Sequence, residues 1–417
     1  MATSERRALP LAVRRHDPEF IPREMVSARN VLVSFGFECN FACRFCMVED
    51  ALGSRRGLSL AALRAFVADG QTMRGVERIV LSGGEVTLDD ALLDYVAAAR
   101  QAPGVRHVRL QTNGTRLASP RLVDAGRDQG VDEFFVSLHG ATAATCDDLT
   151  RVKGSFRAIL RGMETIAARP ARLLVNTCIV EPNHRELPAL VDLVAPLRPA
   201  GLDFWNLWPR LDPHDERRLQ ARVQDVRPSL IAALDRADQL GVRSVVKWFP
   251  RCLLDHHAAK QDNQQPTVLI HETYWEEAPD FSCLYGSICQ HGQDRPCAGL
   301  SHAYVRRFGW EEDTLRPSRA APAAAPPGET AAGLSPQVAR WLGSLGLRPG
   351  QLLGEARLVG AAASEGLLVL QLAGEAGAFE LRVAPRSPQR PAFVTTARFG
   401  VTYAPSGAGT DASAIAA

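Results

Sequence analysis

The sequence predicts an α/β protein: an open (β/α)6 partial barrel, followed by a cysteine-rich region organised by metal and a small α+β domain. Three observations favour this fold. Between residues 30 and about 210, short β-rich runs alternate with helical spacing, and most runs start roughly 30 residues apart, as strand–helix units do. The runs are apolar without strict alternation, as in a parallel sheet covered by helices. Seven of the nine cysteines gather in two groups, at 39–46 and 252–297.

The predicted barrel strands are taken from the runs rich in β-branched and aromatic residues. They cover residues 31–35, 78–81, 105–111, 134–138, 173–180 and 202–208. Apolar residues at helical spacing fill the connections, for example Phe156, Ile159, Leu160 and Met163. Residues 214–247 add a helix and the start of a further strand at 242–248. A closed eightfold barrel would need two more units, which the pattern does not provide.

The remaining segments differ in composition from the barrel. We expect an N-terminal extension at 1–29, the barrel at 30–248 and the cysteine-rich region at 249–316. An Ala/Pro linker at 317–336 precedes the small α+β domain at 337–405, which has one helix at 337–345 and several short strands. The tail at 406–417 is expected to be disordered.

Composition excludes several classes of protein. The chain has 417 residues, 46% of them hydrophobic, and a formal charge of +2, so no overall charge draws it to nucleic acid or an anionic membrane. No apolar run reaches the roughly 18 residues of a membrane span, and residues 1–15 lack a signal-peptide core. We therefore expect a cytoplasmic protein whose cysteines are reduced, ligate metal or take part in catalysis.

The first cysteine group has the spacing of an iron–sulfur loop. Cys39, Cys43 and Cys46 follow the first strand, at the sheet edge where ligands bind in open α/β folds. Three thiolates can hold three irons of a 4Fe–4S cluster and leave the fourth iron open for chemistry. Structural zinc or three packed free thiols are the alternatives.

Further motifs stand at the ends of the next three strands. The group resembles the radical S-adenosylmethionine (radical SAM) superfamily: Cys-x3-Cys-x2-Cys, Gly83-Gly84-Glu85, Thr112-Asn113-Gly114 and Ser137-Leu138-His139-Gly140. Val86 stands where that family usually has proline, which leaves the second motif less rigid. The resemblance covers residues 30 to about 250 and, more weakly, extends to about 316.

The resemblance implies roles for individual residues. Gly83 and Gly84 lack a Cβ and would let backbone approach the amino group of SAM, with Glu85 supporting that ammonium or the loop. Phe45 would contact adenine, Ser137 would lie at the height of the ribose, and Asn113 would be a further residue that binds SAM. The resemblance also implies reductive cleavage of SAM to methionine and a 5′-deoxyadenosyl radical, which abstracts hydrogen from a substrate. A flavodoxin- or ferredoxin-type protein would supply the electron.

The second cysteine group resembles the auxiliary-cluster (SPASM or twitch-like) regions of some radical SAM enzymes. Cys252, Cys283, Cys289 and Cys297 could hold a second 4Fe–4S cluster, although their intervals of thirty, five and seven residues depart from the usual Cys-x2-Cys pair. Zinc or unliganded thiols remain alternatives, and His291 is a further possible ligand. Cys146 and Cys178 are expected to be small buried hydrophobes.

These observations favour an enzyme over other classes of protein. An auxiliary-cluster region favours a peptide substrate, and a nucleotide- or cofactor-derived molecule is the alternative within the same chemistry. A non-catalytic iron–sulfur binding or sensing protein is the alternative outside it. Such a sensor would need the cluster but not Gly83 and Gly84.

Overall fold

The structure is a computed structural model. It describes residues 13–14, 26–53, 57–70, 73–208, 218–269, 281–283, 289, 297–309, 311, 314–316, 338, 342, 347, 350–353, 356–364, 367–374, 377–385, 394–395 and 399–405. Contacts divide the chain into two units, residues 1–279 and 280–417, which we describe separately. Most of the predicted extension, the whole linker and the tail lie outside the described residues.

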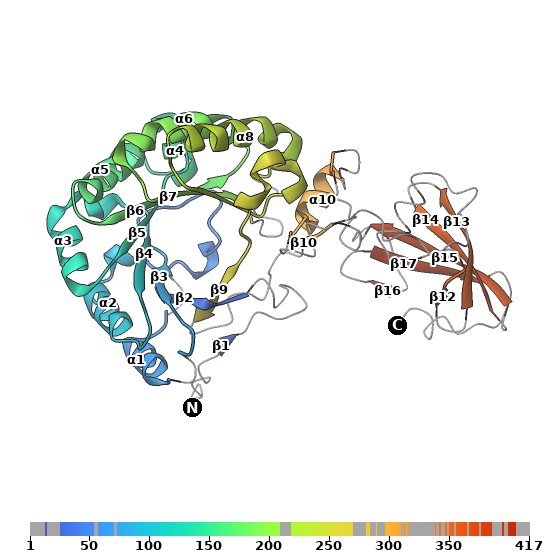
Figure 1. The fold of residues 1–417 in the computed structure, drawn as a ribbon, viewed down its shortest axis with the longest axis horizontal. Coiled ribbons are helices and arrows are strands. Elements are labelled where there is room, and N and C mark those ends of the chain that lie inside the picture. Colours follow the sequence, from blue (N-terminus) through green and yellow to red (C-terminus); the bar gives the residue numbers. More distant parts are fainter. Residues whose placement is uncertain are drawn as a thin grey trace, which may run out of the picture. The chain divides into compact units, whose positions relative to one another are not determined.

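The first unit is built on a curved sheet whose strands run in parallel (Figure 1). In spatial order, the main strands are β2 (Val26–Gly36), β3 (Arg78–Gly83), β4 (His107–Thr112), β5 (Glu133–Ser137), β6 (Arg172–Ile179), β7 (Gly201–Asn206) and β8 (Ser244–Lys247). Each strand pairs with the next along the chain, which is the order that repeated right-handed crossovers produce. The predicted partial barrel is confirmed, and β8 extends it beyond six strands.

An eighth parallel strand comes from the segment that the sequence analysis left outside the barrel. β9 (Gln265–Leu269) pairs with the outer side of β2, with Val31 opposite Thr267, and β1 (Val13–Arg14) pairs antiparallel with β9. The sequence pattern did not predict β9, because the run is five residues long and contains Pro266, which is typical of an edge rather than a barrel strand.

Helices cover the outer face of the sheet (Figure 1). They are α1 (Leu60–Ala68), α2 (Leu92–Arg100), α3 (Pro120–Gln129), α4 (Ala143–Thr150), α5 (Ser155–Ala167), α6 (Leu187–Val194) and α8 (Val223–Gln239). α5 shows why they form there, because Ile159, Met163 and Ile166 recur at helical spacing and are fully buried. No helix among the described residues is long and apolar enough to cross a bilayer.

Two adjacent phenylalanines on β5 distinguish the faces of the sheet. A Cβ built on Gly126 of α3 would lie 3.7 Å from the ring of Phe134, so that ring faces the helices. Because side chains alternate along a strand, Phe135 points to the opposite, inner face of the barrel. Residues paired with Phe135 across the sheet share this inner face.

The second unit contains a six-stranded antiparallel sheet in the order β12-β13-β14-β15-β17-β16. Its strands are β12 (Leu352–Leu353), β13 (Ala356–Ser364), β14 (Leu367–Gly374), β15 (Gly377–Pro385), β16 (Val394–Thr395) and β17 (Phe399–Pro405). β10 (Phe281–Ser282), β11 (Leu300–Ser301) and α10 (His302–Phe308) precede them. Of the predicted helix at 337–345 the structure describes Val338 and Leu342, both helical and buried.

Candidate active site

The cysteine loop follows β2 at the carboxyl edge of the sheet. Cys39, Cys43 and Cys46 are all half-buried free thiols, and the Phe41 amide donates to Cys39 Sγ over 3.4 Å. Burial raises the pKa of Cys43 well above its usual range, and the neighbouring Cys46 and Cys39 thiols raise it further. The three thiols thus lie close enough to oppose one another's ionisation, and a bound cation would offset that cost. This donor set fits three ligands of an iron–sulfur cluster.

The end of α4 fixes the shape of this loop. The Ala42 amide donates to the Thr150 carbonyl over 3.1 Å, and the Arg44 amide donates to the Leu149 carbonyl over 2.9 Å. These carbonyls belong to the last turn of a helix, where they have no partner within the helix itself. Arg44 also pairs with Asp148 at 2.6 Å.

Gly83 and Gly84 bring the end of β3 against the segment that leads into the cysteine loop. A Cβ on Gly83 would lie 2.0 Å from the Gly36 carbonyl oxygen, and one on Gly84 would lie 2.3 Å from that of Glu38. The Gly84 and Glu85 amides donate to these same two oxygens, both over 2.7 Å. The glycines are therefore required for contact between two backbones, and the side of each glycine where a Cβ would stand is filled by protein.

Glu85 is the hub of the strand-end loops. Its carboxylate is 2% exposed and accepts hydrogen bonds from the Thr87 amide, the Thr87 and Thr112 hydroxyls and the Asn113 amide, at 2.5–3.1 Å. Burial raises the pKa of Glu85, and these donors act against that rise. The carboxylate therefore joins the ends of β3 and β4, which is the loop-supporting role of the two that the sequence offered.

Asn113 connects this hub to the cysteine loop. Its Nδ2 donates to Asn40 Oδ1 over 2.7 Å, and its Oδ1 accepts from the amide and hydroxyl of Thr115. Asn40 Nδ2 donates in turn to the Thr115 hydroxyl over 3.0 Å. Asn40 stands between Cys39 and the other cysteines, so it places an amide beside the cluster ligands. The sequence analysis assigned no role to Asn40, which lies inside the cysteine motif, or to Thr115, which directly follows Thr112-Asn113-Gly114.

Phe45 packs beneath the loop. It is buried with Leu149, Val180 and Leu207, and its ring meets His139 edge-to-face with centroids 4.6 Å apart. Burial lowers the pKa of His139 to about 4, so this imidazole is neutral near pH 7. Its Nδ1 accepts from the Cys178 amide over 3.1 Å, which leaves the proton on Nε2.

Polar and aromatic side chains line the inner face of the barrel. Arg109 lies over the ring of Phe135 at 4.9 Å, Phe135 lies 5.8 Å from Trp205 across β6, and Lys247 lies 5.9 Å from the centre of the Trp205 ring. We call these four residues the inner row. Trp208, by contrast, is buried against Trp248 with ring centroids 4.2 Å apart.

Two polar residues lie nearer the carboxyl edge on the same face. Ser137 ends β5 and pairs in register with Asn176 of β6, and both share the face of Phe135. Asn176 is 5% exposed, and its Nδ2 has no hydrogen-bond partner among the described residues. A buried donor without a partner is costly, so it marks a position where a ligand can bind.

The second cysteine group is divided between the two units. Cys252 lies in the 3₁₀ turn η7 (Arg251–Leu253) of the first unit, and Cys283, Cys289 and Cys297 lie in the second. All four are free cysteines, and Cys289 is buried. A second cluster held by these four thiols stays a prediction.

Comparisons with known proteins agree with the geometry of the barrel. Residues 33–194 match the model of the radical SAM superfamily. The GTP 3′,8-cyclase of Synechococcus elongatus is 32% identical over 205 residues, which cover 48% of this chain and 59% of that protein. The enzyme of the same name from Klebsiella pneumoniae is 30% identical over 166 residues, covering 38% and 49%. The chain thus spans about half to three fifths of the length of these relatives.

Solved structures of low sequence identity also match. Streptococcus suis SuiB, in complex with the precursor peptide SuiA, has a TM-score of 0.45 at 13% identity and covers 52% of this chain and 48% of its own. A radical SAM methyltransferase from Sphaerobacter thermophilus has a TM-score of 0.43 at 17% identity, covering 55% and 69%. The matched residues 33–194 contain the cysteine loop and all three further motifs, and this region of the chain belongs to the radical SAM superfamily.

Proposed function

We propose that Cys39, Cys43 and Cys46 would hold the 4Fe–4S cluster that the radical SAM match implies, leaving one iron open for SAM. The single observation that carries this proposal is the position of three free thiols on one loop after β2, a loop held by α4 and by Asn113. When bound, the reduced cluster supplies one electron to SAM, whose bond to the 5′ carbon then breaks to give methionine and a 5′-deoxyadenosyl radical.

The protein supplies the frame for this chemistry. Glu85 fixes the loops after β3 and β4, so that the backbone at Gly83 and Gly84 and the side chain of Asn113 present fixed polar groups to SAM. Phe45 offers an apolar edge to adenine and Ser137 a hydroxyl to the ribose. His139 stays neutral behind Phe45, so no charge is buried beside the cofactor.

We propose that the substrate binds on the inner face of the barrel and is nucleotide-like. The inner row places the partly exposed ring of Trp205, on which a base can stack, beside the ammonium of Lys247, which suits phosphate. Phe135 is buried behind Trp205, and Arg109 is paired with the buried Glu133 at 2.8 Å. Asn176 adds a buried amide donor without a partner among the described residues. The curated relatives, named for a reaction of GTP, support this class over the peptide that the cysteine-rich region favoured.

We further propose that a flavodoxin- or ferredoxin-type protein of the cytoplasm delivers the electron to the cluster.

We also propose that an auxiliary cluster is held by Cys252, Cys283, Cys289 and Cys297. Under this proposal Cys252→Ala lowers the iron content by about one cluster, whereas Cys146→Ala, a control at a buried thiol outside both groups, leaves the iron content unchanged. Equal iron in both variants contradicts the auxiliary cluster.

The substrate class is tested by isotope transfer. The anaerobically reconstituted, reduced enzyme is incubated with SAM and either ribose-deuterated GTP or a deuterated peptide. We expect deuterium from the nucleotide in 5′-deoxyadenosine. Transfer from the peptide alone restores the peptide alternative, and a failure to cleave SAM under any condition favours a non-catalytic iron–sulfur protein.

A matched pair of variants tests the inner face. Trp205→Leu removes the partly exposed ring of the inner row and should raise KM for the nucleotide about tenfold, the loss of roughly one stacking contact. Phe134→Leu changes a ring that faces the helices and should lower stability without changing KM. Equal KM values in the two variants contradict binding on the inner face.

A further inference from the structure

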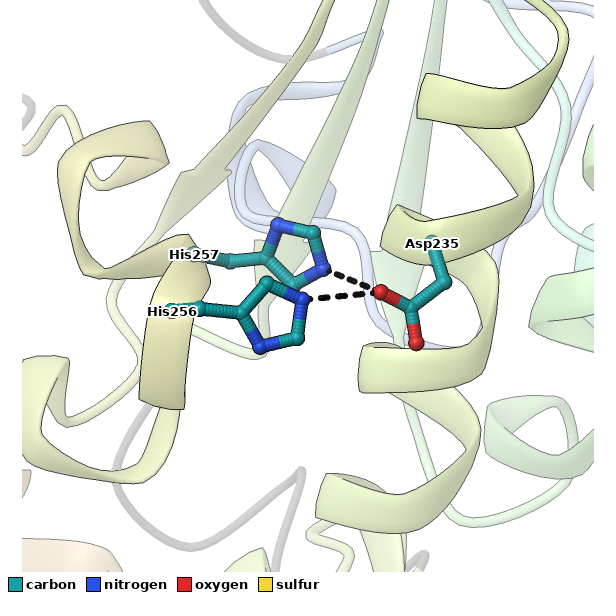
Figure 2. A group of neighbouring side chains, drawn as sticks. All are labelled: Asp235, His256 and His257. Atoms are coloured by element: carbon teal, nitrogen blue, oxygen red, sulfur yellow. Dashed lines mark hydrogen bonds and ion pairs between the residues drawn. The ribbon is translucent and has the colours of Figure 1, made fainter.

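A cluster of metal-binding side chains lies on the helical side of the barrel, apart from the cysteine loop. Asp235 of α8 faces His256 and His257 of η8 (Asp255–Lys260), a 3₁₀ segment that follows β8 (Figure 2). The three donor atoms lie within 4.8 Å of one another. These three residues lie outside the range 33–194 that matches the superfamily model.

Both imidazoles point at one carboxylate oxygen. Asp235 Oδ1 lies 2.9 Å from His256 Nε2 and 2.8 Å from His257 Nε2, and the ring centroids are 3.9 Å apart (Figure 2). Two Nε2 atoms and a carboxylate oxygen are the donors of many zinc sites. With bonds of about 2.0–2.1 Å, a tetrahedral ion would separate adjacent donors by roughly 3.4 Å. The cluster would therefore open by about half an ångström to take the ion.

A second carboxylate lies on the other side of His257. Asp238 Oδ2 lies 3.6 Å from His257 Nδ1, and Lys260 Nζ holds Asp238 through a 2.6 Å ion pair. A neutral His257 that donates from Nε2 to Asp235 presents the lone pair of Nδ1 to Asp238, which is repulsive. An ion at Nε2 moves the proton to Nδ1, and the same contact becomes favourable. This is the carboxylate–histidine–metal arrangement of many zinc sites.

Burial also suits one bound ion. His257 is 3% exposed, whereas His256 is 65% exposed and leaves a route from solvent. Two ion pairs, Arg227 with Asp255 and Lys260 with Asp238, already hold η8 against α8. A metal ion here would close the same junction with bonds that water does not easily replace.

We propose that Asp235, His256 and His257 form a binding site for one divalent transition-metal ion of the zinc class, with Asp238 orienting His257. Solvent completes the coordination on the side of His256. The site ties the segment that carries Cys252 to α8, and it is independent of the function proposed above.

The test measures zinc in the holoenzyme. Cluster-reconstituted protein is treated with a mild chelator, incubated with Zn²⁺, desalted and analysed for both metals. We expect wild type to keep one zinc per chain more than Asp235→Asn or His256→Ala, with equal iron in all three. Asp238→Asn should weaken zinc binding about 10–100-fold without abolishing it. Asp192→Asn, which removes a carboxylate of α6 that pairs with Arg236 of α8, is the control and should match wild type.

X-ray absorption at the zinc edge distinguishes this site from the cysteines. Nitrogen and oxygen ligation that disappears in His256→Ala supports the proposal, and because His256 is largely exposed this variant should fold. Equal zinc in wild type and all variants overturns the proposal, as does ligation by sulfur alone. In either of those cases the cluster is a hydrogen-bonded clamp between η8 and α8 without metal.

Discussion

The two cysteine groups of this chain are organised in opposite ways. The first occupies eight positions, and its backbone is held by the last carbonyls of α4 and by the Asn40–Asn113 hydrogen bond. The second extends from Cys252 to Cys297, and its members are divided between two units. Hydrogen bonds from the protein preform the first site. The second would depend on metal binding for its organisation, as in small metal-stabilised domains.

The two sites therefore differ in what stabilises them: protein contacts at the first and bound metal at the second. Around the first group, a change to one residue of the frame should destabilise the barrel even without iron. Around the second group, the same kind of change should matter only through metal. Unfolding of cluster-free protein therefore measures how strongly the residues around the first group stabilise the barrel.

The largest effect is expected at Gly83. Gly83→Ala places a Cβ 2.0 Å from the Gly36 carbonyl oxygen at a φ of +146°, so the junction of β2 and β3 must move. We expect a loss of at least about 4 kcal/mol in the free energy of unfolding, measured in urea. Gly75→Ala is the control, because Gly75 has a φ of +81° but nothing within 4 Å of its Cβ position, so it isolates backbone strain. Similar losses in the two variants would show that the close approach has no energetic weight.

Glu85→Ala should follow. It leaves four buried donors without their acceptor, and we expect a loss of about 3 kcal/mol in urea unfolding. Glu38→Ala removes an exposed carboxylate near the same junction and should change stability by less than about 0.5 kcal/mol. A Glu85→Ala protein as stable as wild type would contradict the role of this carboxylate as a hub.

His139 should make the barrel sensitive to acid. Burial lowers the pKa of His139 to about 4 in the folded state, against 6.5 for an ordinary histidine. Between these values the unfolded chain binds a proton that the folded chain does not, so stability falls as pH decreases from about 6.5 to about 4. The total loss from this group is about 3 kcal/mol. Unfolding of His139→Asn should show a shallower pH slope in this window, and identical slopes would rule out His139 as the titrating group.

The smallest effect is expected at the rim of the loop. Arg44 and Asp148 form a 2.6 Å ion pair whose side chains are partly exposed, so Arg44→Met should cost less than about 1 kcal/mol. The difference from wild type should shrink in high salt. A loss above about 2 kcal/mol would mean that the pair, rather than the backbone hydrogen bonds to α4, holds the loop.

The sequence predicted the parts of the site that depend on order along the chain. Gly83 and Ser137 end a strand, Cys39 and Asn113 lie just past one, and parallel strands bring their carboxyl ends to one edge. The sequence left two roles for Glu85, support of the SAM ammonium or of the loop, because its partners Thr112 and Asn113 lie 27 and 28 positions away. A sequence pattern does not show which donors reach a buried carboxylate.

The two features that the sequence did not reveal both involve short segments and distant partners. β9 pairs with β2 from more than 230 residues away, through a run with no periodic pattern. Adjacent histidines at 256 and 257 resemble a surface pair until α8 places Asp235 opposite them. Residue propensity and motif spacing predict local structure. These two long-range contacts depend instead on how the whole sheet curves.

The central claim is that the loop of Cys39, Cys43 and Cys46 carries the catalytic cluster. The most direct measurement is the yield of 5′-deoxyadenosine and methionine from SAM, set against iron content, for the reduced wild type and a variant with all three cysteines changed to alanine. We predict equimolar products from wild type, and a variant that has lost about one cluster of iron and makes neither product. A variant that retains full iron, or a wild type that binds iron but never cleaves SAM, would contradict the claim.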